Sequence, residues 1–171
     1  MHYTDIYKND TTNGVGVRVV LWTSGCSHHC KECHNPQTWS PTNGKPYTKD
    51  TENELLTALD KPYINGITLS GGDPLYIGNI ETIYNLVKRI KQELPSKTIW
   101  IYSGFTWEQI FASDTADMCL RKEIIKLCDV FVDGLFDINQ KNIRLKYCGS
   151  ENQKVIDVQK SLNSNNIILF D

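Results

Sequence analysis

Four short apolar runs along the chain predict the strands of a sheet. The first, VRVVLWT at residues 17–23, is rich in β-branched side chains and almost continuously apolar, as expected of a strand covered on both faces. Similar runs occupy residues 66–70 (GITLS), 98–102 (TIWIY) and 129–134 (DVFVDG). Each run is shorter than an ordinary helix, so the pattern favours strands.

The segments between these runs have the apolar spacing of amphipathic helices. Residues 51–59 begin with Thr51 and Glu54, which have the spacing of a capping box, and continue with a stripe of leucines. Residues 79–94 place apolar side chains three and four positions apart, with Asn79 as the expected N-cap. Two helices are therefore predicted here.

The remainder of the chain gives a weaker pattern. Residues 106–127 are interpreted as a helical region, and beyond Gly134 the periodicity fades. The stretch NSNNIILFD at residues 163–171 fits either a last strand or an irregular tail. Because no repeat, low-complexity tract or change of composition marks a linker, residues 1–171 are interpreted as a single domain.

Strands alternating with helices predict an α/β fold with parallel strands joined by right-handed crossovers. In such sheets, ligands bind beyond the carboxyl ends of the strands. Distinctive residues follow each predicted strand at that end: a cysteine-rich segment after the first, then SGGDP, SGF and DGLF. We therefore expect these four segments to share one rim of the sheet.

Composition excludes several classes of function. Eighteen Lys and Arg against 20 Asp and Glu give a net charge of -2, and no dense basic run suggests a nucleic-acid or membrane surface. The first residues lack the apolar core of a secretory signal, and no apolar run approaches the roughly 20 residues of a membrane span. We expect a cytoplasmic protein, in which six cysteines indicate metal or redox chemistry rather than disulfides.

The strongest chemical signal lies in GCSHHCKECHNPQTW, residues 25–39. This stretch holds three cysteines with the spacing C-x3-C-x2-C, namely Cys26, Cys30 and Cys33. A nearby histidine could complete a zinc site with three cysteines, the candidates being His28, His29 and His34. The alternative is a four-iron, four-sulfur cluster, in which three cysteines would leave one iron open to another ligand.

The other three cysteines are scattered along the chain. Cys119 and Cys128 fall near a predicted helix and a predicted strand, where a buried thiol that packs as a small apolar side chain is the expected arrangement. Cys148 lies in the weakly patterned part of the chain. None of the three is predicted to bind metal.

A second signal is LSGGDP, residues 69–74. Gly71 and Gly72 are compatible with a simple tight turn, and Asp73 followed by proline with the start of a helix. The functional interpretation is that two residues without side chains leave backbone groups accessible to a ligand, with Asp73 nearby to bind a cationic group. The residues alone leave both interpretations open.

Together, the two signals resemble the radical S-adenosylmethionine superfamily. The cysteine triplet follows the first predicted strand, and a Gly-Gly-acid motif follows the second. Over nearly the whole chain, successive segments are similar to those of the activating proteins of anaerobic ribonucleoside-triphosphate reductases: NGVGVRVVLWTSGCSHHCKECHNPQTW, NGKPYT, LSGGDPLY, IWIYSGFTWEQI, VFVDGLF and GSENQKVIDV. The resemblance implies a partial, open β/α barrel with mostly parallel strands.

The resemblance also implies a site. In this superfamily three cysteines hold a four-iron, four-sulfur cluster, and S-adenosylmethionine supplies the ligands of the fourth iron. The implied cluster ligands are Cys26, Cys30 and Cys33. The positions implied for S-adenosylmethionine are Glu32, Cys33, His34, Asn35, Gly71, Gly72, Asp73 and Ser103, with Gly104 beside the last. No side chain is implied as a general acid or base, because the cofactors carry the chemistry.

The implied activity is reductive cleavage of S-adenosylmethionine, with the radical passed to a glycine of the large subunit of an anaerobic ribonucleoside-triphosphate reductase. An electron donor such as flavodoxin is implied as a second partner. The alternatives are activation of another glycyl radical enzyme, such as pyruvate formate-lyase, and a non-catalytic zinc-binding module. The sequence does not determine the oligomeric state. A homodimer within the complex with the reductase is one of the possibilities.

Three positions depart from the family's pattern. Val15 in NGVG stands where relatives often carry proline, which should matter little to a loop that keeps Gly14 and Gly16. Glu32 stands where many members of the superfamily carry an aromatic side chain, so contact with adenine there would involve the backbone. Cys148 stands where the family commonly has arginine, directly before the motif GSENQ at residues 149–153. The sequence assigns no role to this motif.

Overall fold

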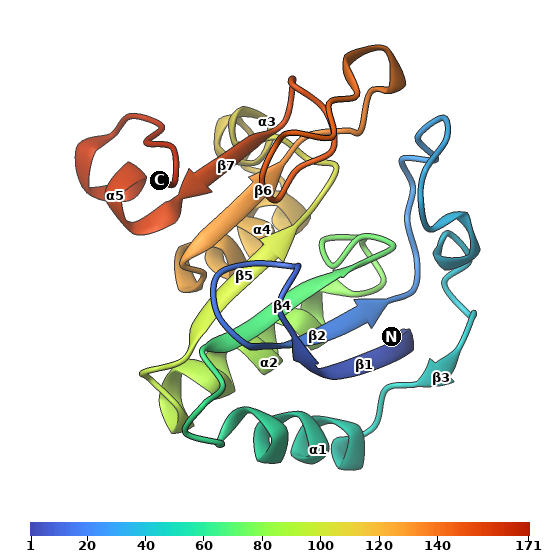
Figure 1. Ribbon diagram of the computed structural model, residues 1–171, viewed down its shortest axis with the longest axis vertical. Helices are drawn as coiled ribbons and strands as arrows, with labels where there is room; N and C mark the ends of the chain where they lie inside the picture. The colour runs from blue at the N-terminus through green and yellow to red at the C-terminus, as the bar shows by residue number, and fades with distance from the viewer.

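Seven strands form one mixed sheet that does not close into a barrel (Figure 1). The structure is a computed structural model, and it describes all residues from 1 to 171. The strands are β1 (His2–Asp10), β2 (Arg18–Thr23), β3 (Lys45–Pro46), β4 (Gly66–Gly71), β5 (Thr98–Tyr102), β6 (Val130–Asp133) and β7 (Lys154–Asp157). Their order in the sheet is β3-β1-β2-β4-β5-β6-β7.

The four predicted strands are present and form the parallel centre of the sheet, β2-β4-β5-β6. Both flanks are antiparallel: β1 pairs with β2 and β3 on one side, and β7 with β6 on the other. The sequence analysis did not predict these flanking strands. The reason is local, because β1 carries mostly polar, solvent-facing residues and β7 has only four residues.

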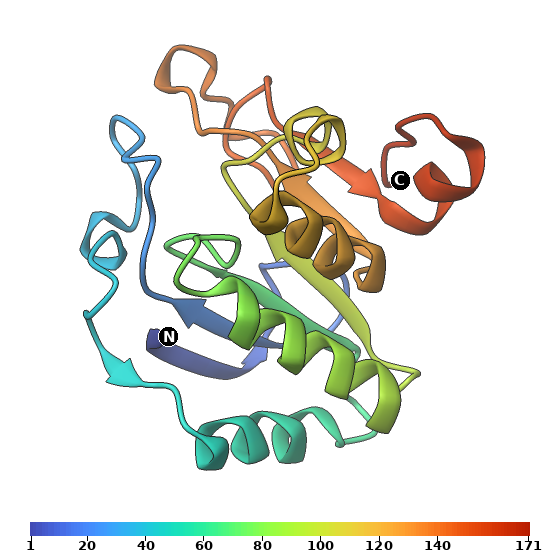
Figure 2. The same ribbon diagram turned by 180° about the vertical axis from the view of Figure 1, so that it is seen from behind.

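Helices connect the parallel strands, and Figure 2 shows α2 and α4 side by side across one face of the sheet. The helices are α1 (Lys49–Leu59), α2 (Ile80–Glu93), α3 (Trp107–Ala112), α4 (Ala116–Leu127) and α5 (Val158–Ser164). Short 3-10 turns lie at Pro36–Thr38 and Ile138–Gln140. The longest helix has 14 residues, and none has the length and apolar character that crossing a bilayer requires.

The predicted start of α1 is wrong by one turn. Thr48 is the N-cap, and its hydroxyl accepts a hydrogen bond from the amide of Thr51, whose own hydroxyl accepts one from the amide of Thr48. This reciprocal pair of hydrogen bonds is the capping box of α1, in place of the capping box predicted between Thr51 and Glu54. A threonine hydroxyl thus serves the role usually given to a carboxylate or amide side chain.

The helical region predicted over 106–127 is two helices. A capping box between Thr106 and Gln109 starts α3, and the backbone is extended at Ser113 and again at Thr115, which caps α4. Extended residues interrupt the hydrogen-bonding pattern of a helix, so the chain turns between the two.

The register of the parallel strands separates the core from the opposite face of the sheet. Buried apolar side chains at matched positions form a row beneath the helices: Leu21, Leu69, Ile101 and Phe131. Because side chains alternate along a strand, the next residues face the other way. These are Ser70, Tyr102 and Val132, and all three line a cavity on that side.

A buried arginine joins the amino ends of three central strands. The guanidinium of Arg18 is fully buried and donates hydrogen bonds to the Thr68 hydroxyl at 2.8 Å, the Ile67 carbonyl at 2.6 Å and the Thr98 carbonyl at 3.1 Å. It also lies 5.3 Å from the ring centroid of Trp100. Burial lowers the pKa of Arg18 to about 10, so the side chain remains charged at neutral pH.

Replacing Arg18 with Met should lower the free energy of unfolding by about 3 kcal/mol, because buried acceptors on β4 and β5 lose their donors. Chemical denaturation of the apoprotein measures this. The control is Lys88→Met on the exposed side of α2, where a change within about 0.5 kcal/mol is expected. Equal stability of the two variants would contradict the role given to Arg18.

Candidate functional site

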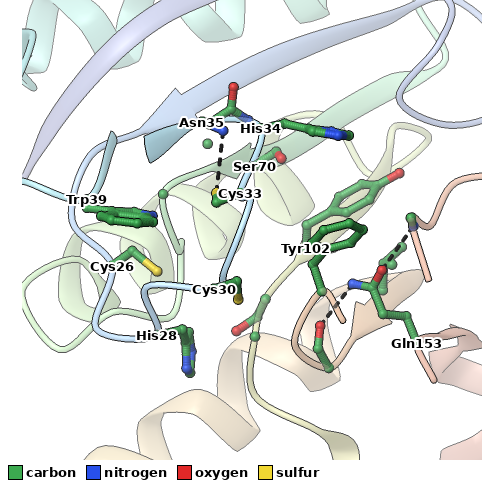
Figure 3. Close-up of a pocket in the computed structure, with 18 residues that line it drawn as sticks. Cys26, His28, Cys30, Cys33, His34, Asn35, Trp39, Ser70, Tyr102 and Gln153 are labelled. Atoms are coloured by element: carbon green, nitrogen blue, oxygen red, sulfur yellow. Dashed lines mark hydrogen bonds between the residues drawn. The ribbon is translucent and has the colours of Figure 1, made fainter. Parts of the chain in front are cut away.

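The segments at the carboxyl ends of the four parallel strands share one cavity, as the order of the motifs predicts. The cavity has a volume of about 220 Å³ (Figure 3). Its wall combines the cysteine segment, residues 25–39, with residues that end or follow β4, β5 and β6. The sheet therefore positions these distant parts of the sequence around one site.

All three cysteines of the triplet line the cavity. Burial raises the pKa of the Cys26 and Cys30 thiols, and backbone amides, that of Phe136 at Cys30 among them, oppose this effect. Cys33 Sγ accepts a hydrogen bond from the amide of Asn35 at 3.4 Å, which Figure 3 shows as a dashed line. The site thus supplies three thiols and amide donors, which suit a metal centre with thiolate ligands.

The thiols face one cavity but do not converge on one point. No three His, Cys, Asp or Glu side chains in the structure lie close enough together to hold a single metal ion. A structural zinc ion needs four donors around one centre. In an iron–sulfur cluster each cysteine binds a different iron, so separated thiols on one cavity fit a cluster better than a zinc ion.

A buried carboxylate lies directly behind the cavity. Asp73 is 1% exposed, and its Oδ2 accepts hydrogen bonds from the Ser103 hydroxyl at 2.9 Å and the Gly104 amide at 3.2 Å. The same oxygen lies 2.8 Å from Nε2 of His28, and Oδ1 accepts from the Leu75 amide at 2.8 Å. Asp73 therefore connects the cysteine segment with the turns after β4 and β5.

Glycines allow these turns to pack against the cysteine segment. A Cβ atom on Gly72 would lie 2.6 Å from the carbonyl oxygen of Gly25 and 2.7 Å from that of Thr38, closer than real side chains approach backbone oxygens. A Cβ atom on Gly104 would overlap the His28 ring. The glycines thus make room for neighbouring parts of the protein as well as forming part of the cavity wall.

The motif GSENQ has a clear structural role. The side-chain oxygen of Gln153 accepts hydrogen bonds from the amides of Gly149 at 2.9 Å and Ser150 at 3.2 Å, and its Nε2 donates to the carbonyl of Gly134 at 2.9 Å. Figure 3 places Gln153 beside the cavity near Tyr102. This glutamine therefore ties the two ends of the segment that follows β6 to each other.

Comparison with known proteins agrees with this geometry. Residues 12–156 match a family described as a 4Fe-4S single cluster domain. Anaerobic ribonucleoside-triphosphate reductase-activating proteins are similar over nearly the whole chain. The relative from Enterobacteria phage T4 is 42% identical over 155 residues, which cover 91% of this chain and 93% of the relative. This chain belongs to the same family.

Two cellular members of the family show the same extent of similarity. The activating protein of Escherichia coli (strain K12) is 38% identical over 157 residues, covering 91% of this chain and 97% of the relative. That of Haemophilus influenzae is 36% identical over 155 residues, covering 90% and 96%. The likeness therefore spans the sheet and the site together, not the cysteine motif alone.

Most of the predicted site residues lie in the cavity wall. They are Cys26, Cys30, Cys33, His34, Asn35, Gly71, Gly72, Ser103 and Gly104. Glu32 is exposed, lies outside the wall and has a left-handed backbone with φ of 57°. Asp73 lies behind the wall with both oxygens engaged, so contact between its side chain and a ligand stays a prediction.

The sequence analysis missed several residues of the cavity wall. They are Trp39, Ser70, Tyr102, Phe136 and Gln153, whereas His28, which also lines the wall, was considered only as a zinc ligand. Strand alternation could have identified Ser70 and Tyr102, because each follows the last core residue of its strand. The prediction for the other cysteines was right for Cys128, which is fully buried, and wrong for Cys119, which is exposed on α4.

Replacing Asp73 with Ala should lower the free energy of unfolding of the apoprotein by about 2 kcal/mol or more, because buried donors of three segments lose their acceptor. Asp73→Asn keeps an acceptor oxygen and should lose less. Chemical denaturation measures both variants, and amide hydrogen exchange should show faster exchange around His28 and Gly104. The control is Asp114→Ala, at a side chain that is 92% exposed. An effect no larger than that of the control would remove the structural role of Asp73.

Proposed function

We propose that this chain activates an anaerobic ribonucleoside-triphosphate reductase. In this proposal Cys26, Cys30 and Cys33 hold a four-iron, four-sulfur cluster, and S-adenosylmethionine binds beside it in the same cavity. The observation that carries the proposal is the set of three thiols that line one cavity without forming a site for a single metal ion, in a chain of this family. An iron without a cysteine is then free to bind the cosubstrate.

When bound, the cluster supplies one electron that splits S-adenosylmethionine into methionine and a 5'-deoxyadenosyl radical, which takes a hydrogen atom from a glycine of the reductase and leaves a glycyl radical. The residues of this chain bind and orient the reactants. Gly71 and Gly72 present backbone at the cavity wall, and Ser103 lines the same wall. No acid–base side chain is needed for this reaction.

The open sheet is compatible with a reaction that needs a second protein at the cavity. The cavity lies at one rim of the seven-stranded sheet, and in this proposal the sheet is a partial barrel of the radical S-adenosylmethionine type. A primary carbon radical must be kept from water and small reductants until it meets its target. A reductase that inserts a glycine-bearing segment would supply both the target and the cover. The electron is proposed to come from a reduced carrier such as flavodoxin.

Cys26→Ala, Cys30→Ala and Cys33→Ala should each abolish or strongly reduce cluster content, because an iron without its thiolate is exposed to solvent and lost. Iron and acid-labile sulfide per chain, after anaerobic reconstitution, measure this. The control is the exposed Cys119, whose change to Ala should leave both values intact.

Cys148→Ala, measured in the same way, tests whether a fourth cysteine binds the cluster. This cysteine lines a hollow next to the cavity, and Tyr102 and Gln153 line both. If Cys148 supplied a fourth ligand, its loss would also lower the iron content. That result would leave no open iron and would contradict the proposed binding of S-adenosylmethionine at the cluster.

The activity itself is tested by mixing this protein, the reductase, S-adenosylmethionine and dithionite under anaerobic conditions. We expect a glycyl doublet in the electron paramagnetic resonance spectrum of the reductase, together with methionine and 5'-deoxyadenosine. The doublet should vanish when the radical-site glycine of the reductase is changed to alanine. Efficient conversion of a small molecule by this protein alone, with no radical on the reductase, would refute the proposal.

A further inference from the structure

The segment after β6 projects beside the cavity and is here named the rim loop, residues 135–148. Figures 1 and 2 both show it leaving the same end of the sheet as the cysteine segment. Phe136 within the rim loop and Gly149 directly after it belong to the cavity wall. Any molecule that rests on the rim loop therefore lies next to the mouth of the cavity.

The base of the rim loop is held in a defined shape. The amide of Asp137 donates to the Ser150 hydroxyl at 3.1 Å, and the amide of Asn142 donates to the Gly149 carbonyl at 3.1 Å. Gln153 adds the hydrogen bonds described above, which close the segment at its ends. These contacts order the loop before any partner arrives, which lowers the entropy lost on binding.

The far part of the rim loop presents an apolar side chain among unpaired cations. Ile143 is 91% exposed. Three exposed cations surround Ile143 in sequence: Lys141, Arg144 and Lys146. None of the ion pairs in the structure includes any of them.

The carboxylates of this region are engaged at its base. Asp137 accepts hydrogen bonds from the amide of Asn139 and the side chain of Gln140, and Glu151 accepts one from the side chain of Asn142. They do not pair with the cations of the loop. The positive charge of the far part is therefore available to an anionic partner.

We propose that the rim loop is the docking element for the reductase, and that it receives a surface of that enzyme with an apolar pocket edged by carboxylates. An exposed aliphatic side chain ringed by charges is suited to a protein interface, where the apolar contact supplies affinity and the charges set orientation. The inference rests on the proposed function, because the reductase is the partner whose glycine must reach the cavity.

A partner seated on the rim loop would align with that reaction. The loop continues into the cavity wall through Phe136, which lines the same cavity as Cys30. Docking at Ile143 therefore holds the reductase against the same piece of chain that borders the cluster ligands. A second copy of this chain in the same place would cover the cavity mouth that the glycine must enter.

The test uses Ile143→Asp and the double variant Lys141→Glu with Arg144→Glu. The matched controls are Tyr63→Asp and Lys61→Glu, an exposed aromatic and an exposed cation that lie together at the opposite end of the sheet. The dissociation constant for the intact reductase is measured anaerobically at low and high salt. Iron content and the 5'-deoxyadenosine formed with dithionite in the absence of the reductase are measured in parallel.

We expect both rim-loop variants to bind the reductase at least tenfold more weakly, and the charge variant to lose most of the salt dependence of binding. Iron content and 5'-deoxyadenosine formation without the reductase should stay at the level of the unmodified protein. Both controls should bind normally.

Unchanged affinity of the rim-loop variants, while the unmodified protein still generates the glycyl radical, would overturn the docking inference and leave the proposed function standing. Failure of the unmodified protein to bind the reductase or to generate the radical would instead refute the proposed function. A change in the oligomeric state of this chain alone, with normal affinity for the reductase, would identify the rim loop as a self-association surface and also overturn the inference.

Discussion

The buried carboxylate of Asp73 constrains the architecture of the site more than any other group. A charge removed from water is stable only where hydrogen-bond donors replace its hydration, and here those donors come from three different segments. His28 is 45 positions away in the sequence and Ser103 is 30 positions away. The ends of β2, β4 and β5 must therefore meet for Asp73 to be satisfied, and their meeting builds the back of the cavity.

The glycines and the strand register also shape the cavity. Gly72 and Gly104 let the turns approach the cysteine segment closely enough for the hydrogen bonds to form. One residue beyond the last core row, the alternation of the strands turns Ser70 and Tyr102 toward the cavity. The same two-residue period that buries Leu69 and Ile101 under the helices thus supplies the cavity wall on the other face.

The features that were predicted correctly from the sequence are those defined by residues close together in the chain. The four central strands and the cysteine triplet are visible because apolar runs and ligand spacing are local patterns. The strand β1 has no such run, since it is held by pairing with β2 and β3 rather than by burial of its own side chains. The roles of Asp73 and Gln153 were not predictable, because each is defined by partners that only the folded chain brings near.

The distribution of order around the cavity shows where the proposed chemistry would need a partner. Hydrogen bonds to Asp73 and the close contacts of the glycines order the back of the site, and the hydrogen bonds of Gln153 order one side, all within this chain. The mouth has no comparable cover, because the rim loop projects away with Ile143 in solvent. Under the proposed function, a site that is ordered at its back and open at its mouth binds its cofactors without a partner. The proposed radical is then protected only when another surface closes the mouth, which would couple its formation to the arrival of the reductase.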